Sequence, residues 1–250
     1  MNIKLTVSFL GKDYLGFQKS PHGKTIEKEL EKALFQVLQA PVYLQASSRL
    51  DAGVSAKGLI VTFFLDKHVD LNKLKRSLNG LLPKDISIEN IECVNAFFHP
   101  SLDSVSKTYL YRICNTTVQS PFLRDISWHY PYKKMDLNLL KESAKSFIGK
   151  MDFSAFTPDD YENAICKIDS IEIFEENGHF QISITGNRFL YKMVRTIVGT
   201  LVNLSTGTIA LSEVEKILEK RQRKQAGLTA PSCGLCLEKV FYENKAYALH

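Results

Sequence analysis

The alternating stretch Ile3-Lys4-Leu5-Thr6-Val7-Ser8-Phe9 decides the fold. Successive side chains of an extended strand point to opposite faces, so the odd-numbered residues of this stretch share one apolar face. Such a face must be covered, and the sequence that begins at Thr25 predicts a helix with its own apolar stripe. The chain therefore opens with a strand and a helix that can cover it. The residues of the stripe are Ile26, Leu30, Leu34, Val37 and Leu38.

The order of the expected elements recurs loosely along the chain. A polar, turn-rich stretch at 100–106 separates the two sets, so we expect an N-terminal α/β half at 1–105 and a C-terminal α/β half at 106–250. In the first half we expect strands at 3–9, 42–46, 59–65 and 86–91, a helix from Thr25, and a helix that Asp70 caps and that ends at Asn79-Gly80. In the second half we expect strands at 108–114, 168–174, 180–185 and 235–242 and helices at 137–147, 189–204 and 211–220.

Length and composition point to a folded protein of the cytoplasm. With 250 residues, of which 44% are hydrophobic, the chain can bury a sizeable core. It has no run near the about 18 apolar residues that span a bilayer, and its first residues do not form a signal-type block. The five cysteines form an odd, scattered set, which argues against disulfides. Only Cys233-Gly-Leu-Cys236 has ligand spacing, and without a second pair we expect no metal site.

Basic residues gather in two segments of the chain. The net charge of +5 permits nucleic-acid binding without requiring it. Solvated helix faces explain each cluster equally well, so both interpretations stay open. The first cluster contains Lys73, Lys75 and Arg76, and the second contains Lys216, Lys220, Arg221, Arg223 and Lys224 among Glu213, Glu215 and Glu219.

The loop Arg49-Leu50-Asp51-Ala52-Gly53-Val54 is the first candidate for chemistry. It lies between two expected strands, where rigid edges commonly support sites. A nearby arginine favours the charged form of a carboxyl group, and an ionised Asp51 can act as nucleophile or base. Ala52 and Gly53 add little bulk, so a planar substrate could approach. A structural turn, in which Asp51 caps backbone amides and Arg49 pairs with it, is an equally open interpretation.

Two further segments carry side chains suited to a nucleic-acid base. In Lys107-Thr108-Tyr109-Leu110-Tyr111-Arg112 the strand alternation places Tyr109 and Tyr111 on one face, where they could stack on a base or pack in the core. Arg195 interrupts the apolar helical stripe that follows Phe189, so it either needs an anionic partner such as Asp51 or reaches the surface. A carboxylate hydrolase would need a second acid, and no well-placed second motif accompanies Asp51.

Eight short motifs occur in order along the chain. The motifs are Tyr14-Leu15-Gly16-Phe17-Gln18, Arg49-x-Asp51-Ala52-Gly53-Val54, Asn79-Gly80-Leu81-Leu82-Pro83, Phe98-His99, Lys107-x-Tyr109-x-Tyr111, Asp152-Phe153-Ser154-Ala155-Phe156, Phe189-Leu190-Tyr191-x-Met193-Val194-Arg195 with Val198-Gly199, and Ala230-Pro231-x-x-Gly234-Leu235. Together they resemble the TruA-type tRNA pseudouridine synthases over nearly the whole sequence.

The resemblance implies an α/β (α+β) fold of two similar halves that share a continuous mixed, mostly antiparallel sheet, flanked by helices, with a central cleft. It implies a homodimer that binds tRNA, without a membrane or DNA partner, a metal or a cofactor. By the resemblance, Asp51 attacks a flipped uridine at positions 38 to 40 of the anticodon stem-loop, and the base rejoins the ribose through carbon. Tyr109 stacks on that base, Arg195 pairs with Asp51, and Arg49 helps to extrude the nucleotide.

The chain leaves the family pattern at a few positions around these motifs. Nucleophile, tyrosine and paired arginine are present, so the resemblance implies intact chemistry with altered RNA contacts. Two alternatives therefore stay open: a relative of the same fold that modifies another RNA or fewer uridines, and a non-catalytic RNA-binding relative. The departures are Leu50 for threonine, Ser55 for histidine, Ser101 for arginine, Lys192 for histidine and Phe17 for tryptophan.

Overall fold

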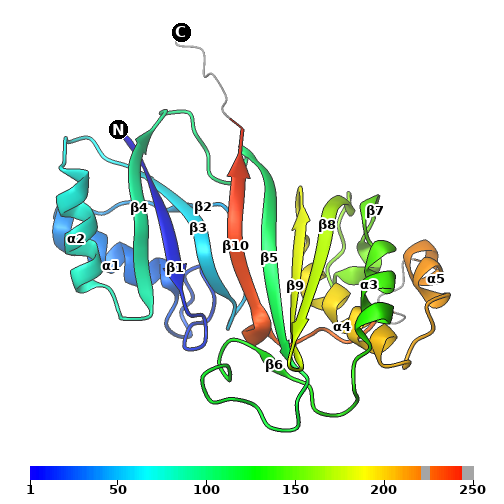
Figure 1. Cartoon of the computed structure of the whole chain (residues 1–250). Coiled ribbons are helices and arrows are strands. Elements are labelled where there is room, and N and C mark those ends of the chain that lie inside the picture. Colours follow the sequence, from blue (N-terminus) through cyan, green and yellow to red (C-terminus); the bar gives the residue numbers. More distant parts are fainter. Residues whose placement is uncertain (221–225, 244–250) are drawn as a thin grey trace. The chain divides into compact units, whose positions relative to one another are not determined.

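The computed structural model describes residues 1–220 and 226–243, which form two compact units (Figure 1). Unit 1 contains Met1–Val105 and the chain from Cys236, and unit 2 contains Ser106–Leu235. The expected C-terminal half of 106–250 therefore differs from unit 2 at its end. The reason is that β10 (Leu235–Tyr242) pairs in parallel with β3 (Ser55–Phe64) of unit 1, through Cys236 opposite Ser55. Arg221, Arg223 and Lys224 of the second basic cluster lie outside the described residues.

The sheet of unit 1 is built around the alternating strand at the start of the chain. The strand order is β4-β1-β3-β10, and β1 (Asn2–Phe9) pairs antiparallel with both β3 and β4 (Ile86–Val94). The short β2 (Gln45–Ala46) pairs with β3. The odd-numbered residues of β1 are buried, whereas Lys4, Thr6 and Ser8 are half-buried on the other face. The predicted alternation is confirmed.

Two capped helices accompany this sheet. α1 (Ile26–Leu38) begins at Thr25, whose hydroxyl accepts a hydrogen bond from the Lys28 amide, and it crosses behind β4 and β1 in the view of Figure 1. α2 (Leu71–Leu81) begins at Asp70 and packs against β4 and α1. The expected end at Asn79-Gly80 is wrong by one residue, because Gly80 keeps a helical backbone and the Leu82 amide still bonds to the Leu78 carbonyl.

In unit 2 the strands follow the order β5-β9-β8-β7. These strands, β5 (Ser104–Cys114), β9 (His179–Gly186), β8 (Ile165–Glu176) and β7 (Gly149–Asp152), pair antiparallel with their neighbours. The short β6 (Trp128–His129) pairs in parallel with β5. The expected fold class, α/β with a mixed and mostly antiparallel strand arrangement flanked by helices, is confirmed.

The helices of unit 2 are α3 (Leu137–Lys145), α4 (Met193–Ser205) and α5 (Glu213–Lys220), with short 3-10 turns η1 (Ser154–Phe156) and η3 (Ser232–Gly234). α3 packs against α4 and β8. The expected start of the long helix at Phe189 is wrong, because Lys192 takes a left-handed backbone conformation with φ of +58° and the helix begins only after it. Nearly every residue of α4 is buried, which suits a helix that is apolar on most of its surface.

The composition led us to expect free cysteines, no membrane-spanning helix and no metal site, and the structure can be compared with each expectation. All five cysteines carry free thiols, as their scattered positions predict. Within residues 1–220 and 226–243, no helix is long and apolar enough to cross a bilayer. The same described residues contain no group of three or more His, Cys, Asp or Glu side chains arranged to hold a metal ion.

Two helical glycines have opposite surroundings, which gives a matched test of the fold. A Cβ atom on Gly199 of α4 would lie 1.8 Å from the Leu228 carbonyl oxygen, whereas one on Gly80 of α2 would meet nothing within 4 Å. We expect Gly199→Ala to lower the free energy of unfolding by about 3 kcal/mol through overpacking. Gly80→Ala should raise it by up to about 1 kcal/mol through helix propensity. Urea unfolding measures both, and a Gly199→Ala protein as stable as the original would contradict the packing of Leu228 on α4.

Candidate active site

Asp51 lies in a tight turn immediately before β3. The Val54 amide donates to the Asp51 carbonyl at 3.2 Å, and Gly53 has a φ of +79° at the third position of the turn. A type II turn requires a positive φ at this position, which favours glycine. Asp51 is half-buried and Arg49 is exposed. The turn therefore presents both side chains at the end of a rigid strand.

Residues 14–17, which we name the clamp segment, hold this turn from the side. The Phe17 amide donates to the Leu50 carbonyl at 3.0 Å, and the Gly53 amide donates to the Tyr14 carbonyl at 3.2 Å. Gly16 has a φ of +92°, and a Cβ atom on it would lie 2.4 Å from the Leu50 carbonyl oxygen. Only glycine allows this close approach of two backbones. The motif at Tyr14-Leu15-Gly16-Phe17 is thus explained by the turn that carries Asp51.

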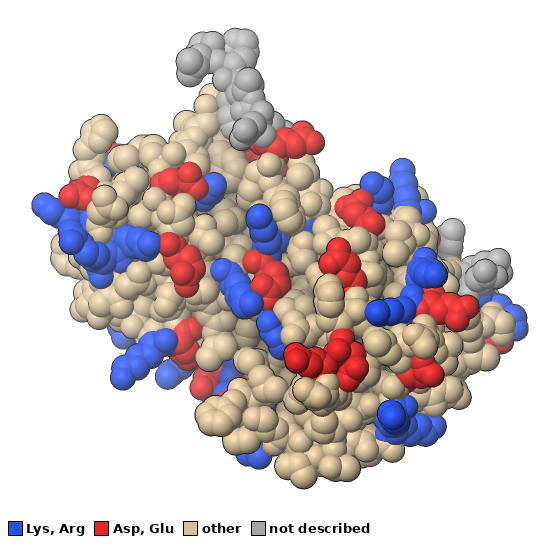
Figure 2. Space-filling view, viewed as in Figure 1, with Lys and Arg blue, Asp and Glu red and all other residues tan. Residues whose placement is uncertain are grey.

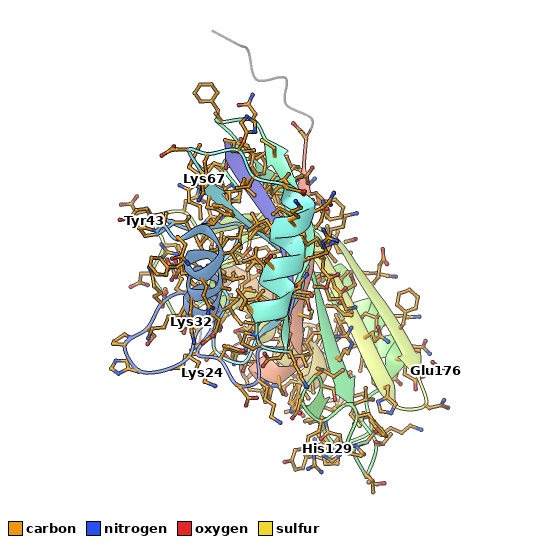
Figure 3. All side chains as sticks on the ribbon, turned by 90° about the vertical axis from the view of Figure 1, so that its left-hand side faces the viewer. Lys24, Lys32, Tyr43, Lys67, His129 and Glu176 are labelled. Carbon is orange, nitrogen blue, oxygen red and sulfur yellow. The ribbon has the colours of Figure 1, made fainter. Side chains whose placement is uncertain are left out.

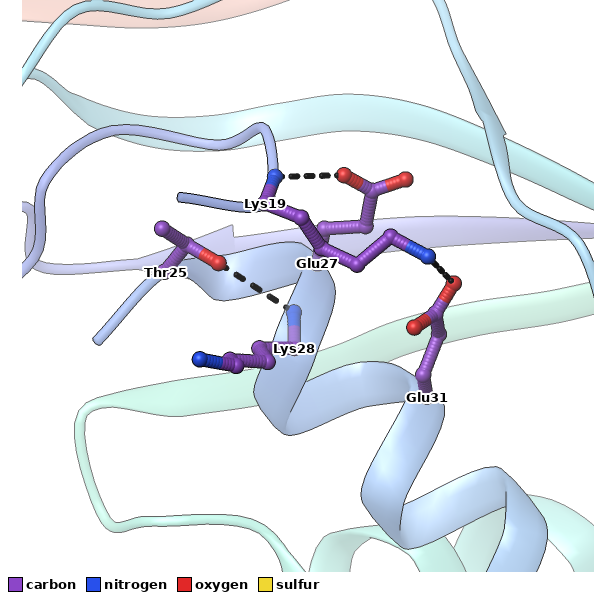
Figure 4. A network of polar contacts seen from close by, with 5 residues as sticks. All are labelled: Lys19, Thr25, Glu27, Lys28 and Glu31. Atoms are coloured by element: carbon purple, nitrogen blue, oxygen red, sulfur yellow. Dashed lines mark hydrogen bonds and ion pairs between the residues drawn. The ribbon is translucent and has the colours of Figure 1, made fainter. Parts of the chain in front are cut away.

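The clamp segment is itself fixed to the rest of unit 1. The Tyr14 hydroxyl donates to Asp85 Oδ1 at 2.8 Å, and burial raises the pKa of Tyr14, so the phenol stays protonated. Beyond the segment, the Lys19 amide donates to Glu27 Oε2 and Lys19 Nζ donates to Glu31 Oε1, both at 2.7 Å (Figure 4). These contacts tie the loop to α1 on one side and to the start of β4 on the other.

The residues that depart from the family pattern have structural partners of their own. Leu50 is 7% exposed and packs into unit 1. The Ser55 hydroxyl accepts a hydrogen bond from the Gly11 amide at 3.0 Å. The Ser101 amide donates to His99 Nδ1 at 3.2 Å. Lys192 starts α4, and its Nζ lies 4.7 Å from the centre of the Tyr191 ring.

Tyr109 lies on β5 in unit 2, with its ring held by a second aromatic side chain. It is 7% exposed, and its ring meets that of Phe189 edge to face, with centroids 5.2 Å apart and an interplanar angle of 86°. Gly186 makes room for Phe189, because a Cβ atom on Gly186 would lie 3.1 Å from Phe189 Cζ. Edge-to-face pairs of this kind favour one ring orientation. Phe189 therefore fixes the orientation of Tyr109.

Tyr111 shares the strand face of Tyr109 but serves a different purpose. It is fully buried, its hydroxyl donates to the Pro231 carbonyl at 2.7 Å, and burial raises its pKa. A Cβ atom on Gly234 would lie 2.6 Å from Tyr111 Cζ, so the glycine admits the ring. Core packing, the alternative left open by the sequence, is the interpretation that fits Tyr111.

Arg195 is the third residue of α4, and a backbone segment holds its guanidinium group. Its Nε donates to the Ala230 carbonyl at 2.7 Å, and the Ala230 amide donates to the Arg195 carbonyl at 3.0 Å. The side chain is half-buried. Pro231, which follows Ala230, accepts the hydrogen bond of Tyr111. The segment Ala230-Pro231 therefore positions both Arg195 and Tyr111.

The candidate residues thus form two groups, with Arg49 and Asp51 in unit 1 and Tyr109 and Arg195 in unit 2. Lys107, for which the sequence suggested no function, is half-buried two positions before Tyr109, and burial lowers its pKa to about 8. The strand alternation that placed the two tyrosines together also places Lys107 on their face. The sequence did not show that Phe189 supports Tyr109, because this contact joins a strand to a loop that is distant in the sequence.

Comparison with known proteins places the chain in a family. The chain matches a family described as tRNA pseudouridine synthase over residues 5–102 and 143–243. A protein named tRNA pseudouridine synthase A 2 from Protochlamydia amoebophila is 43% identical over 248 residues, which cover 96% of this chain and 94% of that protein. Its namesake from Clostridium perfringens is 38% identical over 243 residues, which cover 96% and 99%.

A solved structure also resembles the chain. It is a Cbf5-Nop10-Gar1 complex, which matches with a TM-score of 0.41 at 12% identity and covers 95% of this chain and 59% of that chain.

The lowered pKa of Lys107 predicts a pH dependence of stability. Between pH about 8 and its ordinary pKa of 10.5, Lys107 holds its proton in the unfolded chain but loses it in the folded one. The unfolded state then binds more protons, so the free energy of unfolding gains a contribution that rises with pH across this window. Urea unfolding of the original protein and of Lys107→Met should diverge in favour of the original protein as the pH rises. Parallel curves would contradict the burial of this ammonium group.

Proposed function

The chain belongs to the tRNA pseudouridine synthase family and is an isomerase of uridine in tRNA, and we propose that it acts at positions 38 to 40 of the anticodon stem-loop with Asp51 as nucleophile. The observation that carries this proposal is the clamped turn at Asp51. A nucleophile must be held in place relative to the reacting atoms, because misplacement by about 1 Å can cost about 100-fold in rate. The backbone bonds of the clamp segment to Leu50 and Gly53 meet that requirement.

In the proposed reaction the Asp51 carboxylate bonds to ribose C1′ of the target uridine as the glycosidic bond from C1′ to base N1 breaks. The base then rotates, and C5 forms the new bond to C1′ as the bond from C1′ to Asp51 breaks and releases the carboxylate. The proton on C5 leaves to solvent and N1 takes one up, so the product is an isomer of the substrate. No oxidant, reductant or cofactor enters this balance.

The proposal assigns Tyr109 and Arg49 to the extrusion of the uridine. Extrusion costs a few kcal/mol of unstacking, which an aromatic platform and a cation near the vacated space can offset. The Phe189 contact supports the first assignment, because it holds the ring of Tyr109 in one orientation. The exposure of Arg49 beside the Asp51 turn supports the second. Exclusion of water by the stacked ring would also protect a covalent intermediate from hydrolysis.

Arg195 completes the proposed site as the ionic partner of Asp51. Its Nε donates to the Ala230 carbonyl, which holds the guanidinium group in a fixed position. A homodimer that works in the cytoplasm, as the resemblance implies, is part of the same proposal.

Replacement of Asp51 tests the proposed nucleophile. With purified protein and tRNA that carries tritium at C5 of uridine, Asp51→Ala should lower tritium release by at least about 1000-fold, because the proposed nucleophile is lost. Its affinity for tRNA should stay nearly unchanged. The matched control is Asp13→Ala, which removes the same charge from an exposed position beside the clamp segment and should keep activity. A fully active Asp51→Ala protein would overturn the assignment.

A second candidate function, modification of another RNA or of fewer uridines, is favoured by Leu50 and Ser101, which replace polar and charged residues of the family pattern. A map of pseudouridine in total cellular RNA, with and without the gene, separates the two. We expect loss of pseudouridine at positions 38 to 40 of tRNA and nowhere else. Loss in ribosomal RNA, or at only one of the three positions, would favour the second candidate.

A further inference from the structure

α2 presents a polar groove on the outside of unit 1. Its leucines Leu74 and Leu78 point into the core, and the outward side forms an open groove of about 820 Å³. Pockets for small molecules are lined mostly by apolar side chains, whereas no apolar side chain lines this groove. A polar, extended ligand therefore fits it better. The residues that line this α2 groove are Asp70, Asn72, Lys75, Arg76, Asn79 and Gly80.

The charge of the α2 groove favours an anionic ligand. Figure 2 shows Lys and Arg side chains gathered over α2. Among the residues that line the groove, Lys75 and Arg76 are cations and Asp70 is the one carboxylate. That carboxylate is engaged, because Asp70 Oδ1 accepts from the Lys73 amide at 3.0 Å and this bond lowers the pKa of Asp70. Lys75 Nζ donates to the Glu89 carbonyl at 2.5 Å, which holds one cation at the rim. Arg76 is exposed.

Gly80 is an independent sign of a ligand at the same place. Glycine weakens a helix relative to alanine, and the usual reasons for it are a positive φ or a close neighbour. Gly80 has neither, since its backbone is helical and, apart from its own stretch of helix, no atom of the described residues lies within 4 Å of a Cβ built on it. It lines the α2 groove and leaves bare backbone there. A ligand that lies close to the backbone at Gly80 explains why this position has no side chain.

The floor of the α2 groove is rigid enough to bind a ligand in one register. The side-chain amide of Asn79 donates to the Ile88 carbonyl at 3.0 Å and accepts from the Ile88 amide at 2.7 Å. This pair of bonds fixes the C-terminal part of α2 to β4. Binding therefore requires little further ordering of the helix.

We propose that the α2 groove binds the ribose-phosphate backbone of the RNA substrate, away from the modified uridine; the inference rests on the proposed function. Arginine and lysine side chains suit phosphate oxygens, and the space left by Gly80 lets the sugar-phosphate chain lie close to α2. Such contacts position a nucleic acid without reading its sequence. α2 packs on β4, and β3, which follows Asp51, lies two strands away in the order β4-β1-β3. That spacing is about 10 Å. The groove therefore holds RNA outside the reacting nucleotide.

The test measures the Kd of the full-length protein for an unmodified tRNA transcript at several salt concentrations. We expect Arg76→Glu to raise Kd about tenfold near 0.1 M salt and to flatten the slope of log Kd against log salt by about 1, because a phosphate contact is lost. The loss should appear in KM and not in kcat. The matched control is Lys32→Glu, an equal charge change at an exposed position on α1 of the same unit (Figure 3), for which we expect no change in Kd.

Gly80→Gln separates binding from folding. Glutamine favours a helix over glycine, so the melting temperature should rise, while the side chain fills the α2 groove and Kd should rise several-fold. An unchanged Kd for Arg76→Glu, or an equal rise for Lys32→Glu, would overturn the inference even if the protein forms pseudouridine. Absence of pseudouridine in the product of the original protein would overturn the proposed function instead, whatever the pattern of Kd.

Discussion

The contact between the clamp segment and the Asp51 turn is the constraint on which the account of this protein depends. Two loops of unit 1 approach so closely that Gly16 faces the Leu50 carbonyl with no room for a side chain. Backbone hydrogen bonds on both sides of Asp51 then hold its position. A carboxylate on a loop free to move would lose the geometric advantage that a nucleophile needs. Burial of Tyr14 and its bond to Asp85 extend this constraint to β4.

In unit 2 the candidate side chains are held by a backbone segment instead of a clamped turn. The segment Ala230-Pro231 accepts hydrogen bonds from Arg195 and Tyr111, and so fixes a cation and a strand face together. The close approach of Leu228 to Gly199 brings that segment against α4. In both units the candidate side chains are held by a backbone segment that packs closely against a glycine, at a point where any other residue would clash. Such glycines carry no chemistry, yet the positions of Asp51 and Arg195 rest on them.

Local sequence patterns predicted most helices and strands, but they could not predict contacts between segments that are distant in the sequence. Alternation predicted β1 and the shared face of Tyr109 and Tyr111, and the capping residues Thr25 and Asp70 predicted where α1 and α2 begin. The predicted start of α4 was wrong because the apolar residues before Met193 continue the helical spacing of apolar residues. The left-handed backbone conformation of Lys192, which delays the start, cannot be seen in that spacing.

Pairing of β10 with β3 could not be predicted for a similar reason. A parallel pair leaves no turn signal between its strands, and its two strands here, at 55–64 and 235–242, lie far apart in the sequence. The candidate residues Asp51, Tyr109, Arg49 and Arg195 came from motifs and resemblance. Their supports, Phe189 and Ala230, became visible only through the contacts they make in three dimensions.

The proposed mechanism requires Asp51 and Tyr109 to act on the same uridine. The most direct measurement uses a tRNA transcript with 4-thiouridine at one of the positions 38 to 40, irradiated on the enzyme, followed by mass spectrometry of the cross-linked peptides. We expect cross-links to peptides that contain residues 49–54 and to peptides that contain Tyr109. Absence of cross-links to either of these segments would contradict the proposed site.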